Sequence, residues 1–374
     1  MTERSERGGS HRDDRGGRGY RGGSGGGDRG YRGGSGGGRG GGGRGGDRGY
    51  RGGDRGYRDG ERGRSRRVYD DEPRDGLLAD LVGHLHALDG RSYAAYKAIV
   101  GRYRAPAGWF LHIDRVQADP YAPPTRIHVD VPTDLHGLEL LDEADLLADA
   151  DRRLAVGDFL TRELHAGFRG TALSIASPGQ EILQRSSIIV RPDEKKEGPG
   201  WVLEVRARLA LPAQGRSIQG HEASRIVGRD LVRELEEAMD LTGERSDRLV
   251  RHIATLEDHR ALTATVARNG WVSFLADGSV LPRRSGVSDE PLDGGVPLDA
   301  PESMAATVEL PHVGTVRGTV VEAGVNVIVG GGYHGKSTLL SAIERGVYPH
   351  VPGDGRELVA TVPDAVKVRA ADGR

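Results

Sequence analysis

The stretch that decides the fold is Gly330-Gly-Gly-Tyr-His-Gly335-Lys336-Ser337-Thr338, which follows the apolar run Val325-Asn-Val-Ile-Val329. The β-branched run predicts a buried strand, and residues 337–345 predict a helix that the loop opens. Glycines let backbone N–H groups surround an anion, and the N-terminus of a helix adds partial positive charge. The stretch therefore predicts a loop that binds the phosphates of a nucleoside triphosphate.

Two side chains of this loop suit a nucleotide. Lys336 is a long point charge that can reach the β- and γ-phosphates, and the Ser337 hydroxyl can coordinate Mg²⁺. We therefore expect ATP and Mg²⁺ as cofactors. A structural turn is the alternative for so glycine-rich a segment. The residues expected to bind the phosphates are contiguous: Gly330, Gly331, Gly332, Tyr333, His334, Gly335, Lys336, Ser337 and Thr338.

Only 37 residues follow Ser337. A complete P-loop fold needs several more βα units, including a strand that ends in the acidic residue of the Mg²⁺ site. Residues 358–362 could form a short strand, but Pro363 interrupts it before Asp364. We expect the chain to be the front part of a larger ATPase or a truncated derivative. No catalytic residue is assigned, and hydrolysis by this chain stays undecided.

Composition divides the chain unevenly. Residues 1–67 hold 18 Arg against 9 Asp or Glu, a charge of +9, whereas the whole chain carries −2. They also hold 28 of the 60 Gly and almost no aliphatic residues, so we predict a disordered Arg/Gly-rich tail over residues 1–74. The absence of cysteine excludes disulfides and thiolate metal sites, and no apolar run approaches the ~20 residues that span a bilayer. We expect a cytoplasmic protein without membrane insertion.

A short arginine–glycine–tyrosine unit recurs in this tail and resembles the arginine–glycine–glycine (RGG) tails of RNA-binding proteins. Arginine pairs with phosphate and stacks on bases, and tyrosine offers a further stacking surface. A solubilising or self-associating tail is the alternative, because the acidic residues weaken the positive field. The residues predicted to bind nucleic acid are Arg18, Tyr20, Arg21, Arg29, Tyr31, Arg32, Arg48, Tyr50, Arg51, Arg55, Tyr57 and Arg58.

From about residue 74 the sequence becomes globular. Apolar and polar residues indicate strands at 109–114, 126–131 and 203–211. Helices are predicted at 140–168, 222–241 and 247–268, the last with Ser246 as its N-cap. This order predicts an α+β domain over residues 75–243. A hinge near residues 242–246 would then lead to the P-loop part, residues 244–374.

Other polar residues give weaker signals. The histidines at 84, 86, 252 and 259 form no convincing metal site, and single surface or capping histidines are the default interpretation. Ser285 and Ser288 have no paired base that the sequence identifies, which disfavours a hydrolase triad. Arginines could meet RNA at 206 and 208, or nucleotide phosphate at 283 and 284, but a solvated surface is the alternative for all four.

Several segments together resemble one family, the predicted ATPases of the ABC class, which are soluble proteins distinct from ABC transporters. The matching segments are residues 93–103, 112–120, 185–188, 281–288, 329–338 and 353–357. The resemblance implies a fold of mixed α/β and α+β class: a family-specific α+β N-terminal domain (75–243), then the beginning of an ABC-type nucleotide-binding domain with its Walker A motif (244–374). The Walker B, signature and switch-histidine motifs of the family do not occur in this chain. The family's composite sites imply a dimer when the ATPase domain is complete.

The resemblance and the tail lead to two functional hypotheses. The first is an ATP-binding protein of the soluble ABC ATPase class that couples nucleotide binding or hydrolysis to an RNA-associated process. The second is a non-enzymatic RNA-binding or condensate-forming protein with a vestigial P-loop. The ATP subunit of a transporter is disfavoured because more than 300 residues precede the P-loop.

Overall fold

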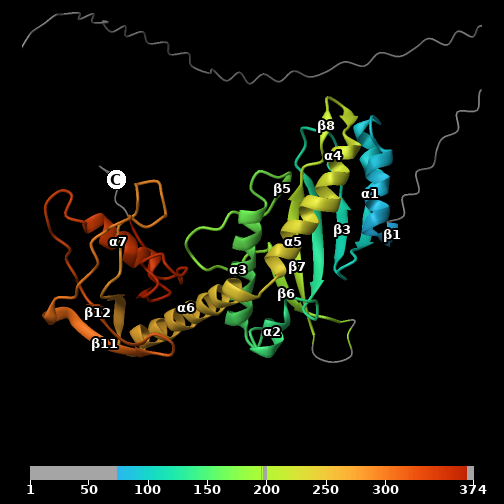
Figure 1. Ribbon diagram of the computed structural model, residues 1–374. Helices are drawn as coiled ribbons and strands as arrows, with labels where there is room; N and C mark the ends of the chain where they lie inside the picture. The colour runs from blue at the N-terminus through green and yellow to red at the C-terminus, as the bar shows by residue number, and fades with distance from the viewer. Residues whose placement is uncertain (1–73, 195, 197–199, 369–374) are drawn as a thin grey trace, which may run out of the picture. The chain divides into compact units, whose positions relative to one another are not determined.

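The computed structural model describes residues 74–194, 196 and 200–368 (Figure 1). These residues mix helices and strands, and they lie within one compact unit. The predicted disorder and the nucleic-acid-binding residues of the tail lie outside the described residues. None of the described helices combines the length and apolarity that crossing a bilayer requires.

The N-terminal part is built on a seven-stranded sheet with the order β1-β2-β3-β4-β7-β5, in which β6 also pairs with β7. All neighbours are antiparallel except β1 and β2. The structure confirms the strands predicted at 109–114, 126–131 and 203–211, because alternate residues of β3, β4 and β7 are buried. The strands are β1 (Arg74–Leu77), β2 (Gly101–Arg104), β3 (Phe110–Arg115), β4 (Thr125–Pro132), β5 (Leu173–Ser174), β6 (Ile188–Pro192) and β7 (Trp201–Leu209), and a separate hairpin comprises β8 (Ala213–Gln214) and β9 (Ser217–Ile218).

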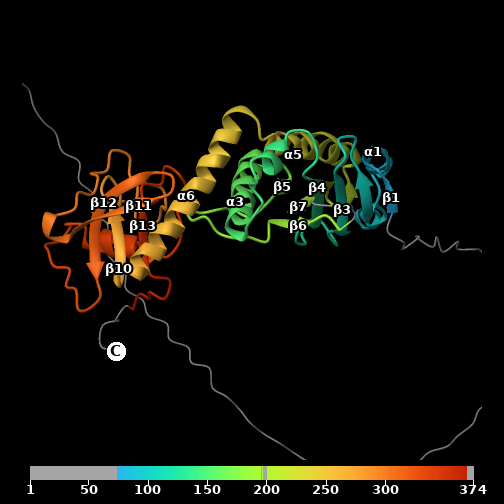
Figure 2. The same ribbon diagram turned by 90° about the horizontal axis from the view of Figure 1, so that it is seen from below.

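Helices lie along one side of this sheet, as Figure 2 shows for α1 and α5 above β3, β4 and β7, and α3 packs next to β6. Their apolar residues and the inward residues of the strands form one hydrophobic core. The predicted helix at 222–241 is confirmed as α4, η2 and α5 in succession. The elements are α1 (Leu78–Ala87), the 3₁₀ helix η1 (Tyr93–Ile99), α2 (Glu139–Glu143), α3 (Ala150–Gly167), α4 (Gly220–Arg225), the π-helical turn η2 (Ile226–Asp230) and α5 (Leu231–Met239).

Two helix boundaries differ from prediction. The helix expected at 140–168 is interrupted between α2 and α3, where Asp145 adopts φ 53° and the Asp149 carboxylate caps α3 by accepting a hydrogen bond from Arg152 N at 2.8 Å. Helix α6 (Gly243–Arg268) begins earlier than predicted. Ser246 is therefore not an N-cap: it lies inside the helix, and its hydroxyl donates to Gly243 O at 2.7 Å.

Helix α6 contributes to two hydrophobic cores. Leu249, Ile253 and Leu256 belong to the N-terminal core, whereas Leu262 and Val266 pack with the second sheet. The hinge predicted near residues 242–246 is therefore wrong for residues 243–246, which are the first turn of a helix shared by both cores.

The C-terminal part contains a four-stranded antiparallel sheet with the order β11-β12-β10-β13. Phe274, Val308 and Val320 form its core with the end of α6. The short strand predicted at 358–362 is confirmed as β13, which pairs with β10. The elements are β10 (Trp271–Ala276), the 3₁₀ turn η3 (Glu302–Met304), β11 (Ala305–Leu310), β12 (Gly314–Glu322), α7 (Lys336–Arg345) and β13 (Val359–Thr361).

The prediction of a buried strand at residues 325–329 is wrong. These residues have no regular structure, and the exposed fractions of Val325, Val327 and Val329 are 97%, 74% and 81%. A β-branched run favours extended backbone, but a strand also needs a neighbour that accepts its hydrogen bonds and covers its face. Within the described residues no strand supplies that neighbour.

Candidate phosphate-binding site

The predicted helix after the glycine loop is confirmed as α7, and its N-terminus is open. Gly335 precedes the helix with φ 76°, a left-handed conformation that favours glycine, and no side chain caps this end among the described residues. The first hydrogen bond of the helix runs from Leu339 N to Gly335 O at 2.9 Å. The amides of the first turn before Leu339 have no acceptor within the helix, so they can bind an anion.

The lysine of the loop is turned inward. Lys336 Nζ donates to Gly330 O at 2.6 Å and also to Gly331 O, although neither carbonyl carries a formal charge. On the other side of the loop, Gly331 N donates to His334 Nδ1 at 3.2 Å. Tyr333 has φ 63° and is fully exposed. The loop therefore holds an ammonium group beside open amides, a set of donors that fits a phosphate chain.

The fit to Mg²⁺ is less complete. Ser337 is exposed, and its hydroxyl has no partner among the described residues. Mg²⁺ in nucleotide sites is usually held by one or two carboxylates together with phosphate oxygens. No carboxylate of the described chain contacts Lys336 or Ser337, so the loop supplies a single hydroxyl toward such an ion.

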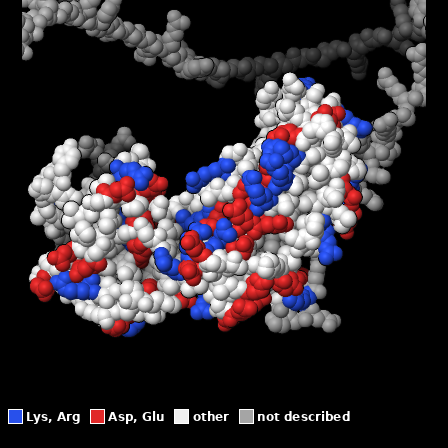
Figure 3. All heavy atoms as spheres, viewed as in Figure 1, with Lys and Arg blue, Asp and Glu red and all other residues white. Residues whose placement is uncertain are grey.

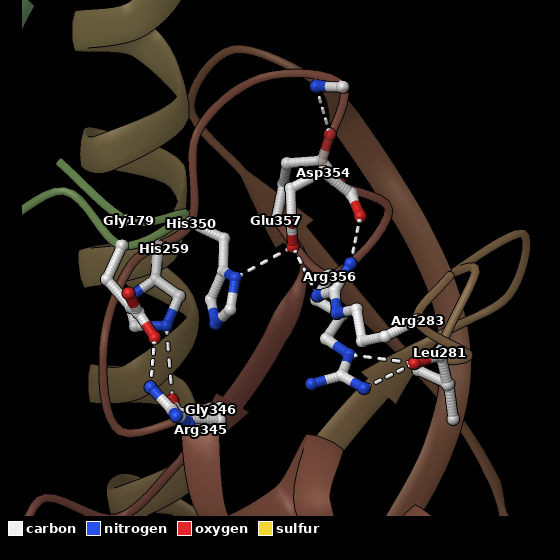
Figure 4. Close-up of polar contacts among 12 residues, drawn as sticks. Gly179, His259, Leu281, Arg283, Arg345, Gly346, His350, Asp354, Arg356 and Glu357 are labelled. Atoms are coloured by element: carbon white, nitrogen blue, oxygen red, sulfur yellow. Dashed lines mark hydrogen bonds and ion pairs between the residues drawn. The ribbon is translucent and has the colours of Figure 1, made fainter. Parts of the chain in front are cut away.

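The C-terminal end of α7 is anchored to its surroundings (Figure 4). His259 of α6 lies with Nε2 3.2 Å from Gly346 O, and the Thr361 hydroxyl of β13 donates to Ile343 O at 2.7 Å. Arg345 pairs with Glu181 at 2.5 Å. Burial lowers the pKa of His259 to about 4, so the ring is neutral near pH 7. The helix behind the phosphate loop is thus fixed by contacts at its far end.

Neither Arg283 nor Arg284 is free to bind a phosphate in the loop, because each pairs with a carboxylate. Arg283 Nη2 binds Asp354 Oδ2 at 2.7 Å, and Asp354 also accepts from His350 Nδ1 at 2.7 Å (Figure 4). Burial raises the pKa of Asp354, but His350 and Arg283 outweigh this, so the pKa lies below its ordinary value. Arg284 is exposed and pairs with Glu290 at 2.5 Å. Arg283 therefore has a structural role, and the alternative prediction that it is a solvated surface arginine is wrong.

Near this network, Arg356 donates to the Leu281 carbonyl, with Nε 3.0 Å from the oxygen. Burial lowers the pKa of Arg356 to about 10. Ser285 and Ser288 accept backbone hydrogen bonds within their own turn, from Val287 and Glu290, and no base approaches them among the described residues. The segment 281–288 thus has a structural role beside residues 350–357.

The histidines named from the sequence do not gather. The rings at 84 and 86 contact Arg74 and His221, whereas His252 and His259 are buried, 3% and 1% exposed, which contradicts a surface position for those two. Sequence reasoning missed another group on β3 and β4. The ligand atoms of His112, His128 and Asp130 lie within 4.8 Å of one another, close enough to hold one metal ion. Only the strand register brings them together, and no sequence motif marks them.

The comparisons with known families agree with this geometry. A model described as the N-terminal domain of ATPases of the ABC class matches residues 78–241, and a model described as the P-loop domain of ABC ATPases matches residues 245–374. No curated protein matches the chain. The second match contains the loop at 330–338, and a P-loop domain of this kind implies nucleotide binding. The chain therefore belongs to the family of ATPases of the ABC class.

Proposed function

We propose that this chain binds ATP at residues 330–338 and couples nucleotide binding to an RNA-associated process. The observation that supports ATP binding is the open N-terminus of α7 beside the inward ammonium group of Lys336. A phosphate chain would accept hydrogen bonds from the first-turn amides. It would also replace the carbonyls of Gly330 and Gly331 as the acceptor for Lys336, which exchanges a neutral acceptor for a charged one.

Several finer assignments belong to the same proposal. Ser337 would contribute its hydroxyl to Mg²⁺ held by the phosphate oxygens, and the ion would neutralise their charge. The tail would associate with RNA in the cytoplasm. The α+β N-terminal domain would comprise residues 75–243, and the beginning of the ABC-type ATPase domain residues 244–374. A complete ATPase domain would act as a dimer.

Calorimetric titration of ATP with Mg²⁺ tests the nucleotide site. Lys336→Ala removes a charge-assisted contact worth about 1.5–3 kcal/mol, so we expect ATP affinity to fall by roughly 10- to 150-fold. Lys367→Ala is the matched control, because Lys367 pairs with Glu344 on the surface at 2.5 Å. Equal affinity in the Lys336→Ala variant and the unmodified chain would show that ATP does not bind in this loop.

Coupling to RNA is tested separately. Binding of a labelled RNA to the full chain is measured with and without saturating ATP, and ATP binding is measured with and without RNA. Linkage requires the two affinities to change by the same factor. If neither ligand alters the affinity of the other, ATP binding and RNA binding are independent, and the proposed coupling is refuted.

A further inference from the structure

One face of the N-terminal sheet is open. The helices of this domain line the opposite face (Figure 2), where the inward residues of β3, β4 and β7 enter the core. The outward residues of the same strands alternate with them and, apart from the buried Val202, are exposed or half-buried. The strand register therefore determines which side chains meet on the open face.

Two rows of side chains cross this face. In the first, which we call the histidine row, Arg102 lies opposite His112, His112 opposite His128, and His128 opposite Arg206. In the second, the arginine row, Arg115 lies opposite Arg126, and Arg126 opposite Arg208. Each row places cationic or protonatable groups on neighbouring strands, with one strand spacing of about 4.8 Å between them.

Like charges directly opposite each other on a sheet destabilise it. The arginine row contains two such pairs, and all three of its side chains are exposed. Within the described residues none of these three guanidinium groups has a hydrogen bond or an ion pair. The sheet thus presents positive charge that its own carboxylates do not compensate.

The carboxylates of the open face are already engaged. Asp130 and Glu204 share Arg191, at 2.8 and 3.0 Å, and Asp114 lies 2.9 Å from His128. The hydrogen bonds and charges of His112 and Arg191 outweigh burial and lower the pKa of Asp130 to about 2. On β2, β3, β4, β6 and β7 the face carries seven arginines against these three carboxylates: Arg102, Arg104, Arg115, Arg126, Arg191, Arg206 and Arg208.

The excess of arginines over carboxylates decides whether the histidine row suits a metal ion or an anion. His112, His128 and Asp130 have the atoms of a metal site, but the two imidazole rings stack with an interplanar angle of 11°. Parallel rings cannot both direct a nitrogen lone pair at one ion between them, and the surrounding arginines would repel a cation. The field favours an anion instead.

Planar side chains narrow the choice of anion. The Arg102 guanidinium lies 3.7 Å from the centroid of the Phe110 ring. Next to Arg102 in the histidine row are the two stacked imidazole rings of His112 and His128. Guanidinium planes and aromatic rings are surfaces on which nucleobases stack, and unpaired arginines nearby can pair with phosphates. An acidic peptide would use the arginines but not the planar groups.

We propose that the open face of β2, β3, β4 and β7 binds single-stranded RNA, with phosphates along the arginine row and bases stacked near Arg102 and Phe110. The opposite, helical side does not offer such a field: in Figure 3 acidic and basic atoms are interleaved over α4 and α5, where Arg225 pairs with Glu222 and Asp230. The inference deepens the RNA part of the proposed function, but it rests on the sheet alone.

Fluorescence anisotropy with a labelled 20-nucleotide single-stranded RNA of mixed sequence tests this site at several salt concentrations. It is run on the full chain and on residues 68–374, which lie within one compact unit. Arg126→Gln combined with Arg208→Gln should weaken binding and reduce the slope of log affinity against log salt by about 1.4, or about 0.7 for each phosphate contact. Phe110→Leu should weaken binding at least fivefold without changing this slope.

The matched control is Arg251→Gln combined with Arg268→Gln. Both are exposed arginines of α6 whose guanidinium groups pair with no carboxylate among the described residues, so this variant should leave affinity and slope unchanged. Circular dichroism and the thermal midpoint confirm that each variant is folded. Unchanged binding in the Arg126/Arg208 variant overturns the inference. The inference is also overturned if polyglutamate displaces the labelled RNA as effectively as unlabelled RNA does.

Deleting the tail separates the two RNA proposals. If residues 68–374 lose all RNA binding, the sheet is not a site, and the tail proposal stands. If they retain the affinity and the salt slope of the full chain, the tail is not the RNA-binding element, and the sheet proposal is supported once the Arg126/Arg208 variant weakens binding.

Discussion

Replacing Asp158 with Asn would remove one negative charge from the interior of the N-terminal domain. The side chain of Asp158 has no exposed surface, and it binds Arg162 Nε at 2.7 Å and also Arg185. His252 Nε2 of α6 lies 3.2 Å away. One carboxylate thus connects α3, α6 and the segment that carries Glu181, the partner of Arg345 at the end of α7.

The expected loss of stability follows from the partners that remain. Arg162 and Arg185 are only 21% and 15% exposed, so without the carboxylate two cations stay largely buried. Removing one member of a buried ion pair typically costs about 3–5 kcal/mol. Because Asn keeps the shape and some hydrogen bonds of Asp, we expect a loss of about 3 kcal/mol in the free energy of unfolding near pH 7.

Urea unfolding measures this loss, and Asp151→Asn is the matched control. Asp151 lies on the same helix and pairs with Arg260, but both side chains are 45% exposed, so its replacement should cost at most about 1 kcal/mol. A double-mutant cycle with Arg185→Gln should reveal a coupling energy between the two sites. Equal losses for Asp158→Asn and Asp151→Asn would refute the reasoning.

The same substitution has a predictable pH dependence. Burial raises the pKa of Asp158, but His252 and Arg162 outweigh it, so the folded-state pKa lies below the value of about 3.9 in the unfolded chain. The stabilisation is therefore complete above about pH 4 and disappears as pH falls through the folded-state pKa. The difference between parent and variant should shrink only in that acidic range.

Two further predictions concern the P-loop part. Burial lowers the pKa of His259 to about 4, so between about pH 6.5 and 4 the unfolded chain binds a proton that the folded chain does not. The free energy of unfolding should therefore fall by about 1.4 kcal/mol for each unit by which the pH drops across that window. His259→Gln should flatten this slope in urea unfolding between pH 7 and 5, and parallel curves would contradict the assignment. In hydrogen exchange, amides of residues 325–335 should exchange without protection while β12 is protected, and ATP should slow residues 330–338; strong protection of 325–329 in the free chain would contradict their exposed conformation.

The elements that could be predicted from the sequence are those whose pattern is local. Alternation of apolar residues identified β3, β4 and β7, and the glycine loop followed by apolar residues identified α7. These patterns work because a strand with one buried face and a helix with one buried stripe carry their environment in their own spacing. The same spacing did not reveal the turn at Asp145, which ends α2 and separates it from α3.

The errors arose where distant residues decide. Residues 325–329 have the composition of a strand, but a strand requires a partner, which composition cannot supply. Asp158 meets Arg185 and His252 from 27 and 94 positions away, so no motif marked this group. The arginine row is likewise a product of register, because Arg115, Arg126 and Arg208 come from three strands.

The most direct measurement is a crystal structure of this chain with Mg²⁺ and a non-hydrolysable ATP analogue at saturating concentration. Our account predicts that the β- and γ-phosphates contact the first-turn amides of α7 and that Lys336 Nζ leaves Gly330 O to bind a phosphate oxygen. An analogue bound elsewhere, or a glycine loop that stays closed on its own lysine, would contradict the account.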